Sequence, residues 1–176
     1  MNFGKLIDFK YKNIVNAILF QITWFGCVAG QISWGLPSLG IMVLFSIAVG
    51  TFWVDIRYAI LAAFIGTLID SAWIFVGILD YSSGTVAPFW ITMLWIAVGL
   101  SLNHALSFFK DRPLLGGFLG AGSAPGCYLV GQSFGGVYVP DSLLLGVISV
   151  VWFFLFYVGF SILRMQAKEQ FSVGKL

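Results

Sequence analysis

The sequence predicts an all-helical, polytopic membrane protein folded as a compact bundle of six transmembrane helices. Composition, the length of the apolar runs and the placement of the charges predict it. Of the 176 residues, 60% are hydrophobic and 9% are charged, whereas a soluble domain carries about 25% charged residues. The mean hydropathy is +0.98. A water-soluble fold with so little charge could not cover its surface, so the apolar runs indicate a bilayer.

Six apolar runs each have about the 20 residues that cross the hydrocarbon core of a membrane. The connections between them are short and leave no room for a soluble domain, so we expect one domain over residues 1–176. The predicted spans cover about residues 14–34, 38–54, 58–79, 87–109, 114–133 and 142–163.

The charges predict the orientation of these spans. All nine basic residues fall on one side of a six-span chain, and the other side carries only Asp80 and Asp141. By the positive-inside rule the basic side is cytoplasmic, so we expect both termini in the cytoplasm. The basic residues are Lys5, Lys10, Lys12, Arg57, Lys110, Arg112, Arg164, Lys168 and Lys175.

Asp70 is the strongest single candidate for a functional residue. It lies 13 positions after Arg57, which places it about 20 Å into the membrane at 1.5 Å per residue. Gly66, Asp70, Trp73 and Gly77 share one helical face, so we expect Asp70 to be buried against other helices. It is interpreted as a carboxylate that binds a proton or a ligand, or as an acid that only ties helices together.

A second polar group is expected near the cytoplasmic side, where Asn103 and His104 lie about 10 Å from the end of their span. Gln21 of the first span reaches a similar depth. We expect these three residues to form a network in which Asn103 faces the first span. Adjacent residues on a helix are rotated by about 100°, so His104 should turn toward the third or fifth span.

Further candidates lie at about the depth of Asp70 or beside Gln21. Trp24 and Cys27 lie on the same stripe of the first span as Gln21, and we expect that stripe to face the bundle. We expect the first, third, fourth and fifth spans to enclose a narrow polar cavity. Its remaining candidate residues, near the middle of the membrane, are Ser71, Ser123 and Pro125.

Several functional classes receive no support. His104 is the single histidine, and without companion ligands we expect no metal site. Cys27 and Cys127 lie in apolar runs and are interpreted as packing residues. The run GGFLGAGSAPG, residues 116–126, lacks the Lys-Ser/Thr ending of a phosphate loop, so we expect no nucleotide cofactor. A net charge of +2 without a basic cluster gives no case for nucleic acid.

Four motifs resemble a family of small proteobacterial inner-membrane proteins classed as a domain of unknown function. They are WFGCVAG, LIDSAW, LNHALSFF and RPLLGGFLGAGSAPGCY. The resemblance covers roughly the first five spans and implies no established activity. It implies that the genes often lie near cyclopropane-fatty-acid-synthase-like genes. The family motifs include Trp24, Cys27, Asp70, Ser71, Asn103, His104 and Pro125.

Three functions remain open. The first is binding or transport of a small or amphiphilic molecule, or of a proton, through the polar cavity. The second is a lipid-modifying enzyme or its accessory subunit, and the third is a structural subunit with a membrane-protein partner. We expect the first, and no catalysis by this chain alone, because no triad or cofactor loop is present in the sequence. A weaker resemblance, in length and topology only, is to the membrane subunits of energy-coupling-factor vitamin transporters.

Overall fold

The computed structural model describes residues 11–82 and 84–173. Lys5, Lys10 and Lys175, used above for the orientation, lie outside these residues. The described chain is helical and contains no β-strand, only an isolated bridge between Asp80 and Tyr138. It divides into two compact units, Met1–Ala105 with Gly131–Pro140 and Leu106–Val130 with Asp141–Leu176. Each unit is described by itself.

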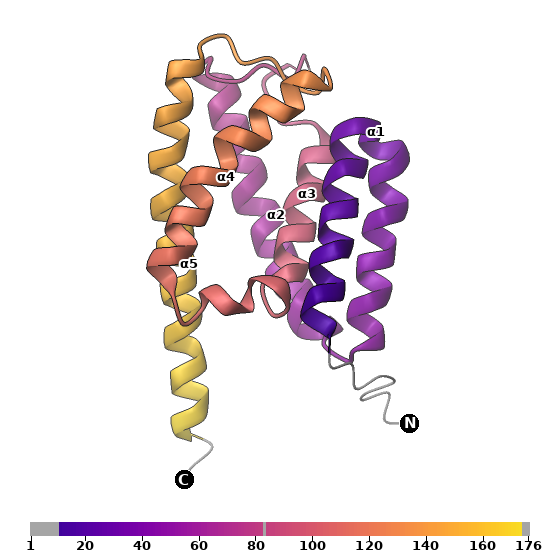
Figure 1. Cartoon of the computed structure of the whole chain (residues 1–176), viewed down its shortest axis with the longest axis vertical. Helices are drawn as coiled ribbons and strands as arrows, with labels where there is room; N and C mark the ends of the chain where they lie inside the picture. The colour runs from indigo at the N-terminus through magenta and orange to yellow at the C-terminus, as the bar shows by residue number, and fades with distance from the viewer. Residues whose placement is uncertain (1–10, 83, 174–176) are drawn as a thin grey trace. The chain divides into compact units, whose positions relative to one another are not determined.

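The described residues form five α-helices and two short 3-10 helices (Figure 1). Four of the α-helices are long and apolar enough to cross a membrane, and α3 is shorter. The α-helices are α1 (Lys12–Ala48), α2 (Phe52–Phe75), α3 (Phe89–Ser101), α4 (Pro113–Ser133) and α5 (Leu145–Val173), and the 3-10 helices are η1 (Ala105–Phe109) and η2 (Ser142–Leu144).

Helix α1 holds both of the first two predicted spans, because it folds back on itself at Gln31 (Figure 1). Gln31 has φ 49° and ψ −125°, which no helix allows. The two halves pack closely beside this reversal. A Cβ atom added to Gly35 would lie 2.6 Å from Cys27 Sγ, so only glycine permits the approach. The first two spans are therefore one helical hairpin.

In the first unit α3 packs against both α1 and α2. Side chains on α3 such as Met93, Ala97 and Leu100 are almost fully buried. Hydroxyls of Thr67 and Thr92 meet at 2.9 Å across α2 and α3. Near the other end of the same pair, Gly99 lies against the backbone of Ala59. These contacts make α2 and α3 antiparallel neighbours.

The second unit pairs α4 with α5 through glycines and phenylalanines. Gly116 lies against the ring of Phe160, and Gly117 lies against the ring of Phe153. Small residues allow two helices to approach closely, which is the usual basis of helix packing in membranes. The glycine run of α4 is thus explained in part by packing.

Several element bounds differ from the predicted spans, such as the end of α5 at Val173 instead of 163, and two of these differences bear on the site. α2 begins at Phe52, six positions before the predicted start at Tyr58, because the chain turns at Gly50, where φ is +76°. The fourth predicted span, 87–109, is a helix of 13 residues followed by a turn and η1. The first difference moves Asp55 from a predicted connection into the first turn of a helix.

Candidate functional site

The carboxylate of Asp55 in the first unit contacts four polar side chains. The side chain is 0% exposed. It lies in the first turn of α2, where the positive end of the helix dipole favours a negative charge. Thr51, the residue before α2, does not cap the helix with its side chain, because its hydroxyl donates to Asp55 Oδ2 at 2.6 Å.

Three further side chains complete the shell around this carboxylate. The hydroxyl of Ser46, near the end of α1, donates to Oδ2 at 2.6 Å. The side-chain amide of Asn103 donates to Oδ1 at 2.8 Å. His104 Nε2 lies 2.9 Å from Oδ2, and the histidine is 1% exposed. Buried charges are tolerated where they are paired and hydrogen-bonded in this way.

Asn103 and His104 both reach Asp55, although they are adjacent in the sequence. A regular helix would point them about 100° apart. The chain avoids this because α3 ends at Ser101, and residues 102–104 form turns before η1. The ring of Phe45 lies edge-on to His104 at 5.5 Å between centroids and provides an apolar wall.

The geometry at His104 favours holding a proton over activating a nucleophile. In a catalytic triad the acid and the nucleophile bind opposite nitrogens of the imidazole. Here Thr51 Oγ1 lies 3.1 Å from Nε2, the same nitrogen that contacts Asp55. A carboxylate has about four lone-pair sites, and four side chains share those of Asp55. The Nε2–Oδ2 contact is therefore suited to a proton shared between an imidazole and a carboxylate.

A second buried carboxylate, Asp70, lies 15 positions further along α2 and is 1% exposed, which confirms its predicted burial. The indole of Trp95 donates to Oδ2 at 2.7 Å, and the phenol of Tyr81 donates to Oδ1 at 3.2 Å. Trp95 can lie over α2 because residue 66 is glycine, and a side chain there would overlap the indole. Burial and then the neighbouring Asp70 raise the pKa of the Tyr81 phenol well above its ordinary value.

The other predicted site residues have different surroundings. Ser71 accepts the backbone N–H of Ala87 at 3.0 Å and donates to the carbonyl of Thr67 at 2.7 Å. Cys27 is fully buried, and Trp24 is half-buried. Ser123 is exposed and Pro125 half-buried on α4, both within the second unit.

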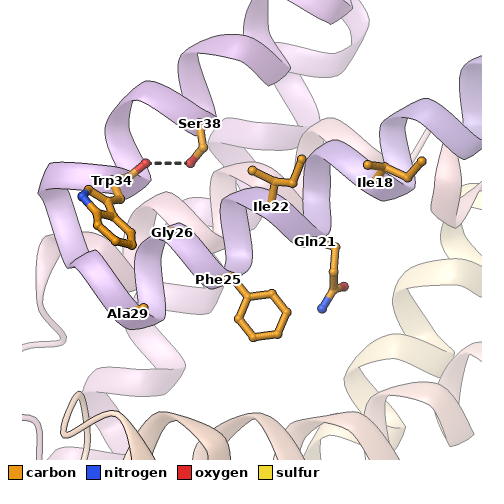
Figure 2. Close-up of a pocket in the computed structure, with 8 residues that line it drawn as sticks. All are labelled: Ile18, Gln21, Ile22, Phe25, Gly26, Ala29, Trp34 and Ser38. Atoms are coloured by element: carbon orange, nitrogen blue, oxygen red, sulfur yellow. Dashed lines mark hydrogen bonds between the residues drawn. The ribbon is translucent and has the colours of Figure 1, made fainter.

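The network predicted for Gln21, Asn103 and His104 is wrong in two respects, the membership of Gln21 and the direction of Asn103. Asn103 and His104 do meet, but at Asp55, and Asn103 does not face the first span. Gln21 is exposed and, with mostly apolar neighbours, lines an open groove on α1 (Figure 2). The α1 residue that hydrogen-bonds to the end of α3 is Asn16, which lies five positions before Gln21, or about 7.5 Å along the helix at 1.5 Å per residue.

Sequence reasoning missed Asp55, Ser46, Thr51 and Asn16. The predicted spans 38–54 and 58–79 place Asp55 and Arg57 in the short connection between them. One signal was available, because Asn103 and His104 were expected near the same cytoplasmic end as Asp55. A buried amide and imidazole need partners, and Asp55 is one of the acids on that side of the membrane.

Taken together, the described residues define an all-helical protein with four helices able to cross a membrane and two buried carboxylates on one helix. The chain belongs to the family described as "Protein of unknown function (DUF2878)", whose model matches residues 13–158. No curated protein and no solved structure matches the chain. The expected proteobacterial origin and gene neighbourhood stay predictions.

Proposed function

We propose that this protein is a membrane protein that binds a proton at the Asp55–His104 pair and uses it in binding or moving a small or amphiphilic molecule. The observation that carries the proposal is the 2.9 Å contact between Asp55 Oδ2 and His104 Nε2, in which both side chains are buried. Intramembrane carboxylates and histidines that pair with one another are typical of proton relays.

The neutral groups around the pair support a site that holds one proton. Hydroxyls of Ser46 and Thr51 and the amide of Asn103 stabilise the carboxylate without adding charge. The carboxylate and the imidazole lie within hydrogen-bonding distance, so one proton can be shared between the two residues. A change in protonation changes the strength of every hydrogen bond to the carboxylate, and so alters how α1, α2 and the end of α3 are held together.

We further propose six crossings of the inner membrane, with both termini in the cytoplasm. Each half of α1 is roughly 25–29 Å long at 1.5 Å per residue, close to the hydrocarbon thickness of about 30 Å. The positive-inside partition of the basic residues supports the orientation. A cysteine introduced at Ser82 or at Asp111, in a Cys127→Ser background whose remaining Cys27 is fully buried, should react with a membrane-impermeant reagent, and the two positions should react from opposite sides. Labelling of both from one side would contradict six crossings.

Infrared difference spectroscopy on the protein in liposomes tests the proton site. Acidification should produce a carboxyl C=O band that is missing in Asp55→Asn. Asp80→Asn, which changes an exposed turn residue, should keep this band. His104→Gln retains the carboxylate of Asp55 and should shift the band. This second variant keeps the test possible if Asp55→Asn does not fold. Bands in His104→Gln and Asp55→Asn identical to those of the unmodified protein would overturn the proposal.

A further inference from the structure

The break between α3 and η1 leaves backbone groups that a continuous helix would pair. In an α-helix the carbonyl of Leu100 would accept from the N–H of His104, and the N–H of Ala105 would donate to the carbonyl of Ser101. Here the N–H of His104 donates to the carbonyl of Ser101 at 3.0 Å instead. This bond shifts the pairing by one residue, so the Leu100 carbonyl and the Ala105 N–H need other partners.

Asn16 of α1 supplies both partners with one side chain. Its Nδ2 donates to the carbonyl of Leu100 at 3.4 Å, and its Oδ1 accepts from the N–H of Ala105 at 3.3 Å. Asn16 is 1% exposed. A buried amide with one donor and one acceptor in use is thus inserted where the helix pairing is interrupted. Without it, two backbone groups would be left unpaired in a buried place, which would destabilise the turn.

We infer that Asn16 is a positioning residue of the Asp55 site: it holds α3 open at residues 102–104 so that Asn103 and His104 reach the same carboxylate. The two side-chain hydrogen bonds described for Asn16 go to Leu100 and Ala105, and neither goes to Asp55. It acts through the two residues on either side of the turn. The inference rests on the proposed function for its biological meaning, but the geometry can be tested separately.

The test uses the single histidine of the chain. Protein labelled with ¹⁵N only in histidine, carrying no histidine tag, reports the hydrogen bonding of His104 alone. Asn16→Leu, of similar size but without hydrogen bonds, should change the His104 signals at one fixed pH. Asn13→Leu is the matched control, because Asn13 lies one turn earlier on α1 and is exposed; it should leave the signals unchanged.

Asn16→Asp serves if Asn16→Leu does not fold. Its carboxyl group keeps an acceptor for the N–H of Ala105 but, when ionised, has no donor for the carbonyl of Leu100. We therefore expect His104 signals between those of the unmodified protein and those of a protein in which the imidazole is displaced. A folded Asn16→Leu or Asn16→Asp protein with unchanged His104 signals would overturn the inference. The proposed function fails on a different result, the absence of any response of the Asp55–His104 pair to pH in the unmodified protein.

Discussion

Gly99 of α3 lies directly against Ala59 of α2, and a Cβ atom at position 99 would come within 2.6 Å of both the Ala59 nitrogen and the Tyr58 carbonyl oxygen. These are backbone atoms, which cannot turn away as a flexible side chain would. Gly99→Ala should therefore force the two helices apart, and we expect a loss of about 1–3 kcal/mol in the free energy of unfolding.

Gly40→Ala is the matched control for this prediction. Gly40 lies in a helical half of α1, and an added Cβ there would meet no atom within 4 Å. Alanine favours a helix over glycine by about 1 kcal/mol, so this variant should be at least as stable as the unmodified protein. Thermal unfolding of both variants in the same detergent checks the pair. Equal destabilisation of the two would contradict the close crossing of α2 and α3.

The contact between Gly66 and Trp95 leads to a second prediction. Gly66→Ala should push the indole away from Asp70 and destabilise the protein, because the added methyl group overlaps the ring. In a Trp95→Ala background the space is free, so the same change should cost little. A double-mutant cycle of unfolding free energies measures this coupling. A cost that is equal in both backgrounds would exclude the indole as its cause.

The reversal of α1 at Gln31 leads to a third prediction. A non-glycine residue at φ 49° and ψ −125° costs about 1–3 kcal/mol. Gln31→Gly should raise the stability by removing this strain. Gln21→Gly, a change of the same kind within a regular helical half, should lower it by about 1 kcal/mol. Chemical or thermal unfolding shows whether each variant gains or loses stability. A loss of stability in Gln31→Gly would contradict the hairpin geometry.

Tyr81 predicts a loss of stability at high pH. Its pKa in the folded state is raised, while an unfolded tyrosine titrates near pH 10. The neutral phenol is therefore favoured by folding, and its contribution is complete below about pH 10 and decreases as the pH rises above that value. Tyr81→Phe lacks the titrating group, so the stability difference between the unmodified protein and this variant should shrink above about pH 10. Unfolding temperatures measured across this range check the prediction, and a constant difference would contradict it.

The parts of this structure that follow from local pattern were predictable, whereas the parts that depend on a break in the pattern were not. Apolar runs predict the helices, and the cost of a carboxyl in lipid predicts the burial of Asp70. Hydropathy places Asp55 in the connection between two predicted spans, because charged residues such as Asp55 and Arg57 usually mark the end of an apolar span. Its burial depends on hydroxyls, an amide and an imidazole from three other segments.

The interruption of α3 has no signal of its own in the sequence. Residues 102–104 contain no proline or glycine, so helical periodicity continues through them. The break is stabilised by Asn16, which is 84 positions away from Leu100. A prediction based on helical periodicity in the fourth span therefore points the side chains of Asn103 and His104 in different directions. Only the three-dimensional contact shows that both meet Asp55.

A pH titration of His104 by ¹⁵N NMR tests directly whether Asp55 and His104 share a proton. The assignment of the signals is unambiguous because the chain has a single histidine. We expect Nε2 to carry or accept a hydrogen-bonded proton shared with Asp55, and its signal to change as the pair takes up a proton. Asp55→Asn should alter this response, while Asp80→Asn should preserve it. His104 spectra that are the same in Asp55→Asn and in the unmodified protein at every pH would contradict a shared proton site.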